Sequence, residues 1–402
     1  MTAQSKLCWV PYYSAEITYL STKPCCKLQL ERDQLPYKNL QDFDSEHATT
    51  WRIENFERGQ LSKACASCDV PTTVYNYRQS NQRMFQRDGW QEPQKAQLRR
   101  LTVGMDNVCA SSCIPCGPHY STTIGRLVEQ HSPQRRIMVS DQPTTGLQQI
   151  NLEQLNGQIA DLEILHLFGG EPFVSPNFTR LLELVTEQSP KLKRITASTG
   201  LCRIKAGHLA QLAQLADRGC EIYILVSLDG PMDLHSWIRG ITESEFWQGW
   251  NLLLEQHPHV KISGFQTTLG AYNVFALPEY VEFVKELWEK LPQDYRTRVP
   301  LTIMSTAVTQ PSMVCARQLP QEVKEPLKHQ LAQSLVSAPE FARELYQTAL
   351  HHVSLPSDQE WSTAQDRINT YSQWRGNHEH TVASWIEHFM GVKCSINNMF
   401  NK

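Results

Sequence analysis

Short apolar runs and longer amphipathic stretches alternate along the chain from residue 99 onward. Six runs have the length and the flanking turn residues of buried β-strands, and they cover residues 99–105, 162–168, 193–198, 221–227, 261–268 and 300–305. Four stretches between them have the period of amphipathic helices, at residues 178–188, 205–217, 243–256 and 278–290. Thr242 and Glu245 stand at capping-box spacing at the start of the third helix. These units predict an α/β protein with a parallel sheet, which is either an open doubly wound layer or a curved, partly closed barrel.

The two ends of the chain have different patterns. Residues 1–97 are aromatic and polar, with short extended pieces such as residues 16–22, and are too irregular for strand–helix units. We expect a small separate module there that a bound metal helps to fold, because the free energy of ligation adds to that of folding. After Pro320 the chain becomes helical, with helices predicted at residues 321–337, 339–353, 358–373 and 381–390. The chain therefore divides into residues 1–97, 98–310 and 311–402.

Composition narrows the class of protein. The 402 residues are 41% hydrophobic, which is enough for a large core, and the net charge of -3 argues against bulk nucleic-acid binding. No apolar run approaches the roughly 20 residues that cross a membrane, and no signal peptide is recognised, so we expect a soluble, cytoplasmic protein. Eight of the 12 cysteines fall within the first 116 residues. In a long chain of a reducing compartment, such clustering indicates metal or redox chemistry rather than disulfides.

Three cysteines follow the first predicted strand closely. Cys109, Cys113 and Cys116 have the spacing Cys-x3-Cys-x2-Cys. Three thiolates on one tight loop suit three corners of a cubane iron–sulfur cluster, and they leave the fourth iron open for chemistry. A structural zinc site is the alternative, with His119 completing a Cys3His set.

The end of the second predicted strand strengthens the iron–sulfur interpretation. Gly169 and Gly170 allow a ligand to approach the backbone closely, and Glu171 can accept hydrogen bonds from an ammonium group. The cysteine loop and this Gly-Gly-Glu-Pro run, one strand apart, together resemble the radical S-adenosylmethionine (SAM) enzymes. The resemblance covers residues 98–310 and implies a partial (β/α)6 TIM-like barrel.

The same resemblance implies a role for particular residues. Cys109, Cys113 and Cys116 would hold a [4Fe–4S] cluster whose open iron binds SAM, and Gly169, Gly170 and Glu171 would contact the SAM amino group. Ser198 closes the third strand, and Ser227 and Asp229 close the fourth in a Ser-x-Asp-Gly run. These three would contact SAM, Ser227 or Asp229 at its carboxylate or ribose. Gln266, Thr267 and Asn273 are further candidates.

Five more cysteines lie in the N-terminal region, at Cys8, Cys25, Cys26, Cys65 and Cys68. A Cys-x2-Cys pair with upstream cysteines can complete a four-thiolate site for zinc or for a second iron–sulfur cluster. We expect Cys8, Cys25, Cys65 and Cys68 to be the ligands. Cys26 is the substitute for Cys25, because adjacent residues of an extended chain point to opposite sides. The segment also resembles the twitch or SPASM modules of radical SAM enzymes, which implies an auxiliary cluster, of the [4Fe–4S] type.

The resemblance implies an activity. A reduced [4Fe–4S] cluster would cleave SAM to methionine and a 5'-deoxyadenosyl radical, which abstracts hydrogen from the substrate, with flavodoxin or ferredoxin as the one-electron donor. The auxiliary cluster would relay electrons if fully ligated, which four cysteines favour, or bind substrate if one iron is open. A peptide or protein residue is one substrate class, and a small metabolite (amino acid, sugar or nucleotide) is the other. The alternative outside enzymes is a zinc or iron–sulfur binding protein without SAM turnover.

Overall fold

The computed structural model describes residues 8–25, 28, 35–57, 65, 77–131, 146–309, 312–376 and 380–391. Two of the predicted or substitute metal ligands, Cys26 and Cys68, lie outside the described residues. None of the helices in the described part of the chain is long and apolar enough to cross a membrane.

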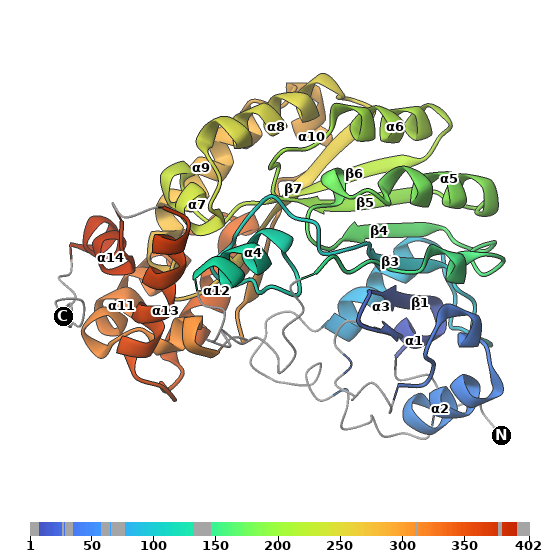
Figure 1. Cartoon of the computed structure of the whole chain (residues 1–402), viewed down its shortest axis with the longest axis horizontal. Coiled ribbons are helices and arrows are strands. Elements are labelled where there is room, and N and C mark those ends of the chain that lie inside the picture. The colour runs from blue at the N-terminus through green and yellow to red at the C-terminus, as the bar shows by residue number, and fades with distance from the viewer. Residues whose placement is uncertain are drawn as a thin grey trace.

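The described strands form one sheet of eight strands in the order β2-β1-β3-β4-β5-β6-β7-β8. The strands are β1 (Ser14–Ile17), β2 (Thr22–Lys23), β3 (Arg100–Gly104), β4 (Ile164–Phe168), β5 (Arg194–Thr199), β6 (Glu221–Ser227), β7 (Val260–Leu269) and β8 (Ile303–Ala307). All neighbours pair in parallel except β1 and β2. The sheet is curved, and within the described residues no pairing joins its outer strands β2 and β8 (Figure 1). The chain therefore has an α/β fold with a mostly parallel, curved and open sheet.

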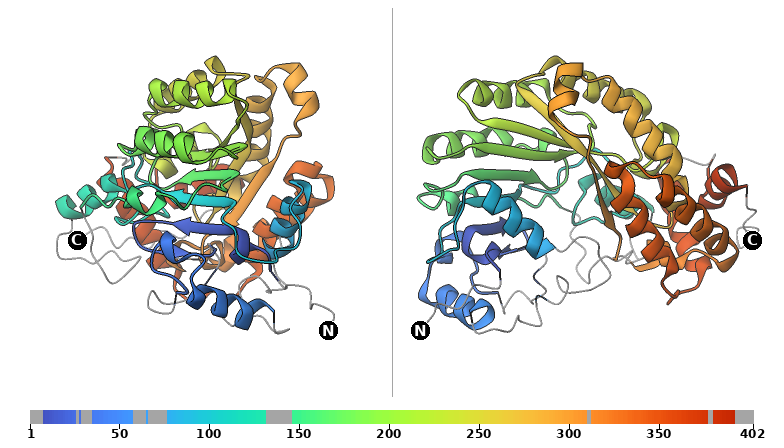
Figure 2. Two further views of the ribbon diagram at one scale, coloured as in Figure 1. Left: turned by 90° about the vertical axis from the view of Figure 1, so that its right-hand side faces the viewer. Right: turned by 180° about the vertical axis from the view of Figure 1, so that it is seen from behind.

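Helices cover the convex side of this sheet. The helices between the strands are α4 (Thr122–His131), α5 (Phe178–Gln188), α6 (Ala206–Asp217), α7 (Met232–Arg239), α8 (Glu243–Glu255), α9 (Leu277–Glu289) and α10 (Gln293–Arg298). The C-terminal helices are α11 (Gln321–Ser337), α12 (Glu340–Ser354), α13 (Trp361–Trp374) and α14 (Val382–Met390). They gather beyond β8, which α12 contacts directly (Figure 2). The opposite, concave side of the sheet is left to line a cavity.

The strand residues alternate between these two sides. In β5 the buried Ile195 and Ala197 face the helices, whereas Thr196 and Ser198 on the other face are only half-buried. This period of two places polar side chains on the concave face and apolar ones in the core. The six predicted strands and the capping box of Thr242 in α8 are confirmed.

The N-terminal region differs from the prediction. It contains α1 (Val10–Tyr13), α2 (Glu46–Phe56) and α3 (Tyr77–Arg87), and its strand β1 pairs in parallel with β3. The expectation that this region contains no strand–helix unit is therefore wrong, because β1, two helices and β3 form one. The region still has a small core of its own, which includes Trp9, Phe85 and Trp90. The boundaries near residues 97 and 310 stay predictions.

Candidate active site

The loop between β3 and α4 carries Cys109, Cys113 and Cys116, called the loop cysteines below. Its backbone is held by α7. The Ser112 N–H donates to the Arg239 carbonyl at 2.9 Å, and the Ile114 N–H donates to the preceding carbonyl of α7 at 3.0 Å. The Cys116 N–H donates to the Cys113 carbonyl at 3.0 Å, which makes a turn between these two cysteines. Backbone hydrogen bonds therefore fix this loop on both sides of Cys113.

The two glycines after β4 bring a second loop against the first. The Gly170 N–H donates to the Asp106 carbonyl at 3.1 Å, and the Glu171 N–H donates to the Val108 carbonyl at 2.8 Å. A Cβ atom on Gly170 would lie 2.2 Å from the Val108 carbonyl oxygen, and Gly169 has a φ of +134°. Both positions therefore require glycine for the packing of the two loops. Their predicted contact with SAM stays a prediction.

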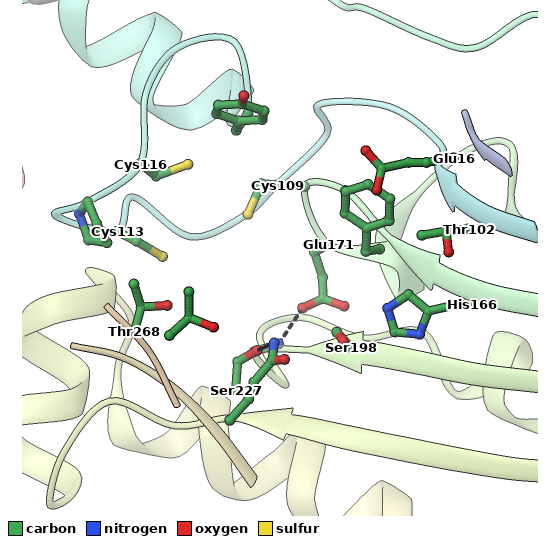
Figure 3. A pocket seen from close by; sticks show the side chains of 18 of the residues that line it. Glu16, Thr102, Cys109, Cys113, Cys116, His166, Glu171, Ser198, Ser227 and Thr268 are labelled. Carbon is green, nitrogen blue, oxygen red and sulfur yellow. Dashed lines mark hydrogen bonds between the residues drawn. The ribbon is translucent and has the colours of Figure 1, made fainter. Parts of the chain in front are cut away.

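A cavity of about 570 Å³ lies at the carboxyl ends of the strands, where parallel α/β sheets bind ligands. Figure 3 shows the loop cysteines on one side of this cavity, with Glu171 and Ser198 across from them. The predicted site residues that line it are Cys109, Cys113, Cys116, Gly169, Gly170, Glu171, Ser198, Ser227, Asp229 and Gln266. Thr267 and Asn273 do not line it. The structure therefore brings residues from five successive strand ends to one cavity.

The donor atoms of the loop cysteines suit an iron–sulfur cluster. Burial raises the pKa of each thiol, that of Cys116 to about 12. Without metal the thiols are therefore protonated, and coordination to a positive centre would deprotonate them. A cubane cluster with one open iron is bound by three soft thiolates and by no fourth protein ligand.

In the described part of the chain, His119 does not supply the fourth ligand that the zinc alternative needs. His119 does not line the cavity that holds the loop cysteines. Among the residues that the structure describes, no three His, Cys, Asp or Glu side chains are arranged around a single metal ion. A cubane differs from a single ion because each thiolate binds a separate iron at its own corner. The geometry therefore favours a cluster over a zinc ion on this loop.

Glu171 is held at the cavity wall by its neighbours. One carboxylate oxygen accepts a hydrogen bond from the Thr199 hydroxyl at 2.8 Å, and the other accepts one from the Gly200 N–H at 2.9 Å. Burial raises the pKa of Glu171 to about 7, although these hydrogen bonds lower it. An ammonium group beside it would favour the charged form. The carboxylate is thus oriented for a cationic ligand group.

Asp229 is paired with Arg239, a largely buried cation that the short sequence motifs do not indicate. Arg239, at the end of α7, donates from Nε to Asp229 at 2.9 Å and from Nη2 at 2.8 Å. Both residues line the cavity, and Arg239 lies close enough to Cys113 to interact electrostatically with its thiol. The sequence offers one signal for this contact. Arg239 precedes a glycine and lies ten residues after Asp229, which belongs to the Ser-x-Asp-Gly run.

Three candidate residues lie on or after the fifth predicted strand. Their side chains donate hydrogen bonds to residues at the end of the fourth predicted strand. Gln266 donates to the Ser227 hydroxyl at 2.7 Å. Thr267 donates to the Asp229 carboxylate at 3.3 Å, and Asn273 donates to the Asp229 carbonyl at 3.0 Å. Thr267 and Asn273 therefore hold Asp229 in place without lining the cavity themselves.

Arg375, in the Trp-Arg-Gly run after α13, reaches the cysteine loop from the C-terminal region. Its Nη1 donates to the Ser112 and Ile238 carbonyls, both at 3.1 Å. The simplest expectation for this residue is a surface arginine at a helix end. The structure instead makes it a clamp between α7 and the loop, which only tertiary packing can show.

Cys8, Cys25 and Cys65 are called the N-terminal cysteines below. They pack on one apolar cluster that contains Trp9 and Tyr12. Cys25 also lines the 570 Å³ cavity. Three of the four predicted ligands of a second metal site therefore lie on one apolar cluster, and their ligand role stays a prediction.

The remaining described cysteines are ordinary core residues. Cys202, Cys220 and Cys315 are buried in the main hydrophobic core, as single cysteines usually are.

No family model matches this chain, and no curated protein matches its sequence. Among solved structures, the chain is similar to anSMEcpe with bound AdoMet, at 17% identity and a TM-score of 0.36 over 52% of each chain. It is also similar to Streptococcus suis SuiB bound to precursor peptide SuiA, at 12% identity and a TM-score of 0.35 over 74% of this chain and 59% of that one. A third similar structure is TYW1 with a lysine-pyruvate adduct bound, at 16% identity and a TM-score of 0.28 over 57% of this chain and 70% of that one. The match to anSMEcpe thus spans about half the length of that protein.

Proposed function

We propose that this protein is a radical SAM enzyme. The observation that carries the proposal is the cavity that has the loop cysteines on one wall and Glu171 with Arg239 on the others. The loop cysteines would hold a [4Fe–4S] cluster with one open iron. When bound there, the cluster supplies the electron that cleaves SAM into methionine and a 5'-deoxyadenosyl radical, which takes hydrogen from the substrate.

The residues around the cavity suit the polar groups of SAM. The Glu171 carboxylate would accept hydrogen bonds from the SAM ammonium group, and the Arg239 guanidinium would pair with the SAM carboxylate. Ser198 and Ser227 offer hydroxyl groups on the same wall. Because Glu171, Arg239 and Ser227 are fixed by hydrogen bonds of their own, they would orient SAM without first having to be ordered. Asp229 then acts mainly by holding Arg239.

The N-terminal cysteines, with Cys68, would hold the auxiliary cluster of a twitch-like or SPASM-like module. The packing of Cys8, Cys25 and Cys65 on one apolar cluster supports this assignment. Four thiolates would complete the ligation of a [4Fe–4S] cluster, which favours electron relay. The position of Cys25 on the cavity wall supports an exchange of electrons with whatever reacts in the cavity.

The substrate that we propose is a peptide or protein residue. A one-electron donor such as flavodoxin or ferredoxin would reduce the clusters. The reducing cytoplasm is the compartment in which such thiolate sites assemble.

Anaerobic reconstitution tests the proposal. The protein is loaded with iron and sulfide and incubated with dithionite and SAM, and methionine and 5'-deoxyadenosine are measured. We expect both products from the wild-type protein and from a Cys220→Ala control, since Cys220 is a core residue outside the cavity. Absence of both products from the reconstituted wild-type protein would leave only an iron–sulfur or zinc binding protein.

A further inference from the structure

The end of the cavity opposite the loop cysteines has its own polar lining. Arg100 and Thr102 come from β3, and His166 and Phe168 come from β4. Thr102 and His166 are direct partners across the two strands, and Arg100 lies two residues before Thr102 on the same face. In Figure 3, His166 and Thr102 lie on the side of the cavity opposite the cysteine sulfurs. These residues belong to neither proposed cluster site.

Arg100 differs from the other arginines of this sheet. Arg99 is paired with Glu163, and Arg194 is paired with Asp88 and Glu221. The Arg100 guanidinium donates to the Asn81 amide oxygen at 2.5 Å and has no carboxylate partner among the described residues.

Glu16, an acidic residue that lines the same cavity, already has a basic partner. Its carboxylate lies 3.1 Å from the Lys23 ammonium. This end of the cavity therefore holds the half-buried Arg100, which has no counter-ion in the described part of the chain, and this favours binding of an anionic group.

The neighbours of Arg100 are hydrogen-bond donors. Burial and the nearby Arg100 lower the pKa of His166 to about 4, so its imidazole is neutral near pH 7 and keeps one N–H to donate. The Thr102 hydroxyl lines the same space. The Phe168 ring stacks with His166 at a centroid distance of 6.3 Å and offers an apolar surface beside these donors.

We propose that Arg100, with His166 and Thr102, binds a carboxylate of the substrate, which makes the substrate an acidic residue or acid. This inference rests on the proposed function, because the cavity is taken as the reaction site. A carboxylate suits the site better than a phosphate does, since one guanidinium matches one negative charge. The Phe168 ring would contact the carbon chain that carries the carboxylate.

Binding of simple probes to the reconstituted, SAM-loaded protein tests this inference. The probes are N-acetylglutamate, the blocked peptide acetyl-Ala-Glu-Ala-amide, N-acetylglutamine and inorganic phosphate, and titration calorimetry gives the dissociation constants. We expect binding of at least one carboxylate probe, weakened on the order of 10- to 100-fold in Arg100→Gln. Arg100→Lys should keep part of the affinity, because it keeps the charge but loses the planar fork.

The matched control is Arg180→Gln, which removes the same charge from the exposed surface of α5. It should bind the probes like the wild-type protein. Preference for the peptide or for free N-acetylglutamate distinguishes the two sources of the carboxylate, and either one supports the inference. Unaltered affinity in Arg100→Gln, equal binding of N-acetylglutamine, stronger binding of phosphate, or no binding of any carboxylate probe at 50-fold excess over protein would each overturn it.

The assay of SAM cleavage keeps this inference separate from the proposed function. Arg100→Gln should still bind SAM and still release 5'-deoxyadenosine with dithionite in the absence of substrate. A protein that cleaves SAM but binds no carboxylate contradicts the subsite alone. A protein that binds carboxylate through Arg100 but never cleaves SAM contradicts the proposed function alone.

Discussion

The loop cysteines and the N-terminal cysteines are held in different ways. The loop cysteines lie within eight consecutive residues whose backbone is hydrogen-bonded to α7. The N-terminal cysteines come from three separated segments and pack through side chains on an apolar cluster. The segment that follows Cys8 is held against α2 by the buried Arg52, which donates to the Pro11 carbonyl at 2.7 Å. A contiguous, backbone-held loop is already shaped for its metal, whereas a group assembled from distant segments depends more on the metal for its folding.

Substitution of one cysteine in each group gives the largest expected effect. Cys113→Ala should abolish SAM cleavage, because two thiolates cannot hold the three-corner cluster, while iron bound by the N-terminal cysteines is retained. Cys25→Ala should lose the other iron and keep SAM cleavage. Iron content and 5'-deoxyadenosine are measured for both. Full SAM cleavage by Cys113→Ala would show that the wrong loop has been assigned.

Gly170→Ala should disrupt the loop that carries the loop cysteines and leave the N-terminal cysteines unaffected. The new Cβ would lie 2.2 Å from the Val108 carbonyl oxygen, so the two loops must separate. We expect a loss of about 3 kcal/mol in the free energy of unfolding, with loss of the loop's cluster. In the control, Gly207→Ala on α6, the Cβ meets no atom within 4 Å and should leave stability unchanged or raise it by about 1 kcal/mol. Equal denaturant midpoints for the two variants would contradict the packing argument.

Arg375 and Arg52 each hold one of the two groups of cysteines in place. Arg375→Ala removes hydrogen bonds to the Ser112 and Ile238 carbonyls, and we expect a loss of about 2 kcal/mol together with faster release of iron from the loop. Arg52→Ala should instead speed the release of iron from the N-terminal cysteines. The measurement is the rate of iron loss to a chelator, followed by the spectrum of each cluster. The same rates in both variants would mean that the two groups are not held independently.

The smallest effect concerns the pH dependence of SAM binding. The pKa of Glu171 is raised to about 7 in the ligand-free chain, and the SAM ammonium group requires the carboxylate form. Protonation therefore competes with SAM, and affinity should fall as the pH decreases below 7, by at most about tenfold per pH unit. Equilibrium dialysis between pH 6 and pH 8.5 measures this, and Glu171→Gln should flatten the profile. A flat profile in the wild-type protein would contradict the role given to Glu171.

The sequence predicted the regular part of the molecule well. Strand β6 spans Glu221–Ser227, as expected, and the capping box at Thr242 forms, because both are specified by neighbouring residues. The pairing of strand β1 could not be predicted in this way. The strand has four residues and overlaps the extended piece expected at residues 16–22, but its partner β3 begins more than 80 residues later.

The site was predicted in the same uneven way. The loop cysteines, Gly170 and Glu171 form short motifs, and the structure brings them to one cavity. Arg375 lies 263 residues after the loop that it clamps, and nothing in its local sequence indicates that contact. The role of Gly170 in packing against Val108 also depends on contact between two loops, whereas the motif alone suggested space for a ligand.

Electron paramagnetic resonance of the reduced clusters, with and without SAM, tests whether SAM binds the cluster on the loop cysteines. The comparison uses Cys25→Ala, which retains the loop cysteines, and Cys113→Ala, which retains the N-terminal cysteines. We expect SAM to change the signal of Cys25→Ala, because SAM binds the open iron on the loop, and to leave that of Cys113→Ala unchanged. A signal that responds to SAM only in Cys113→Ala would contradict this expectation.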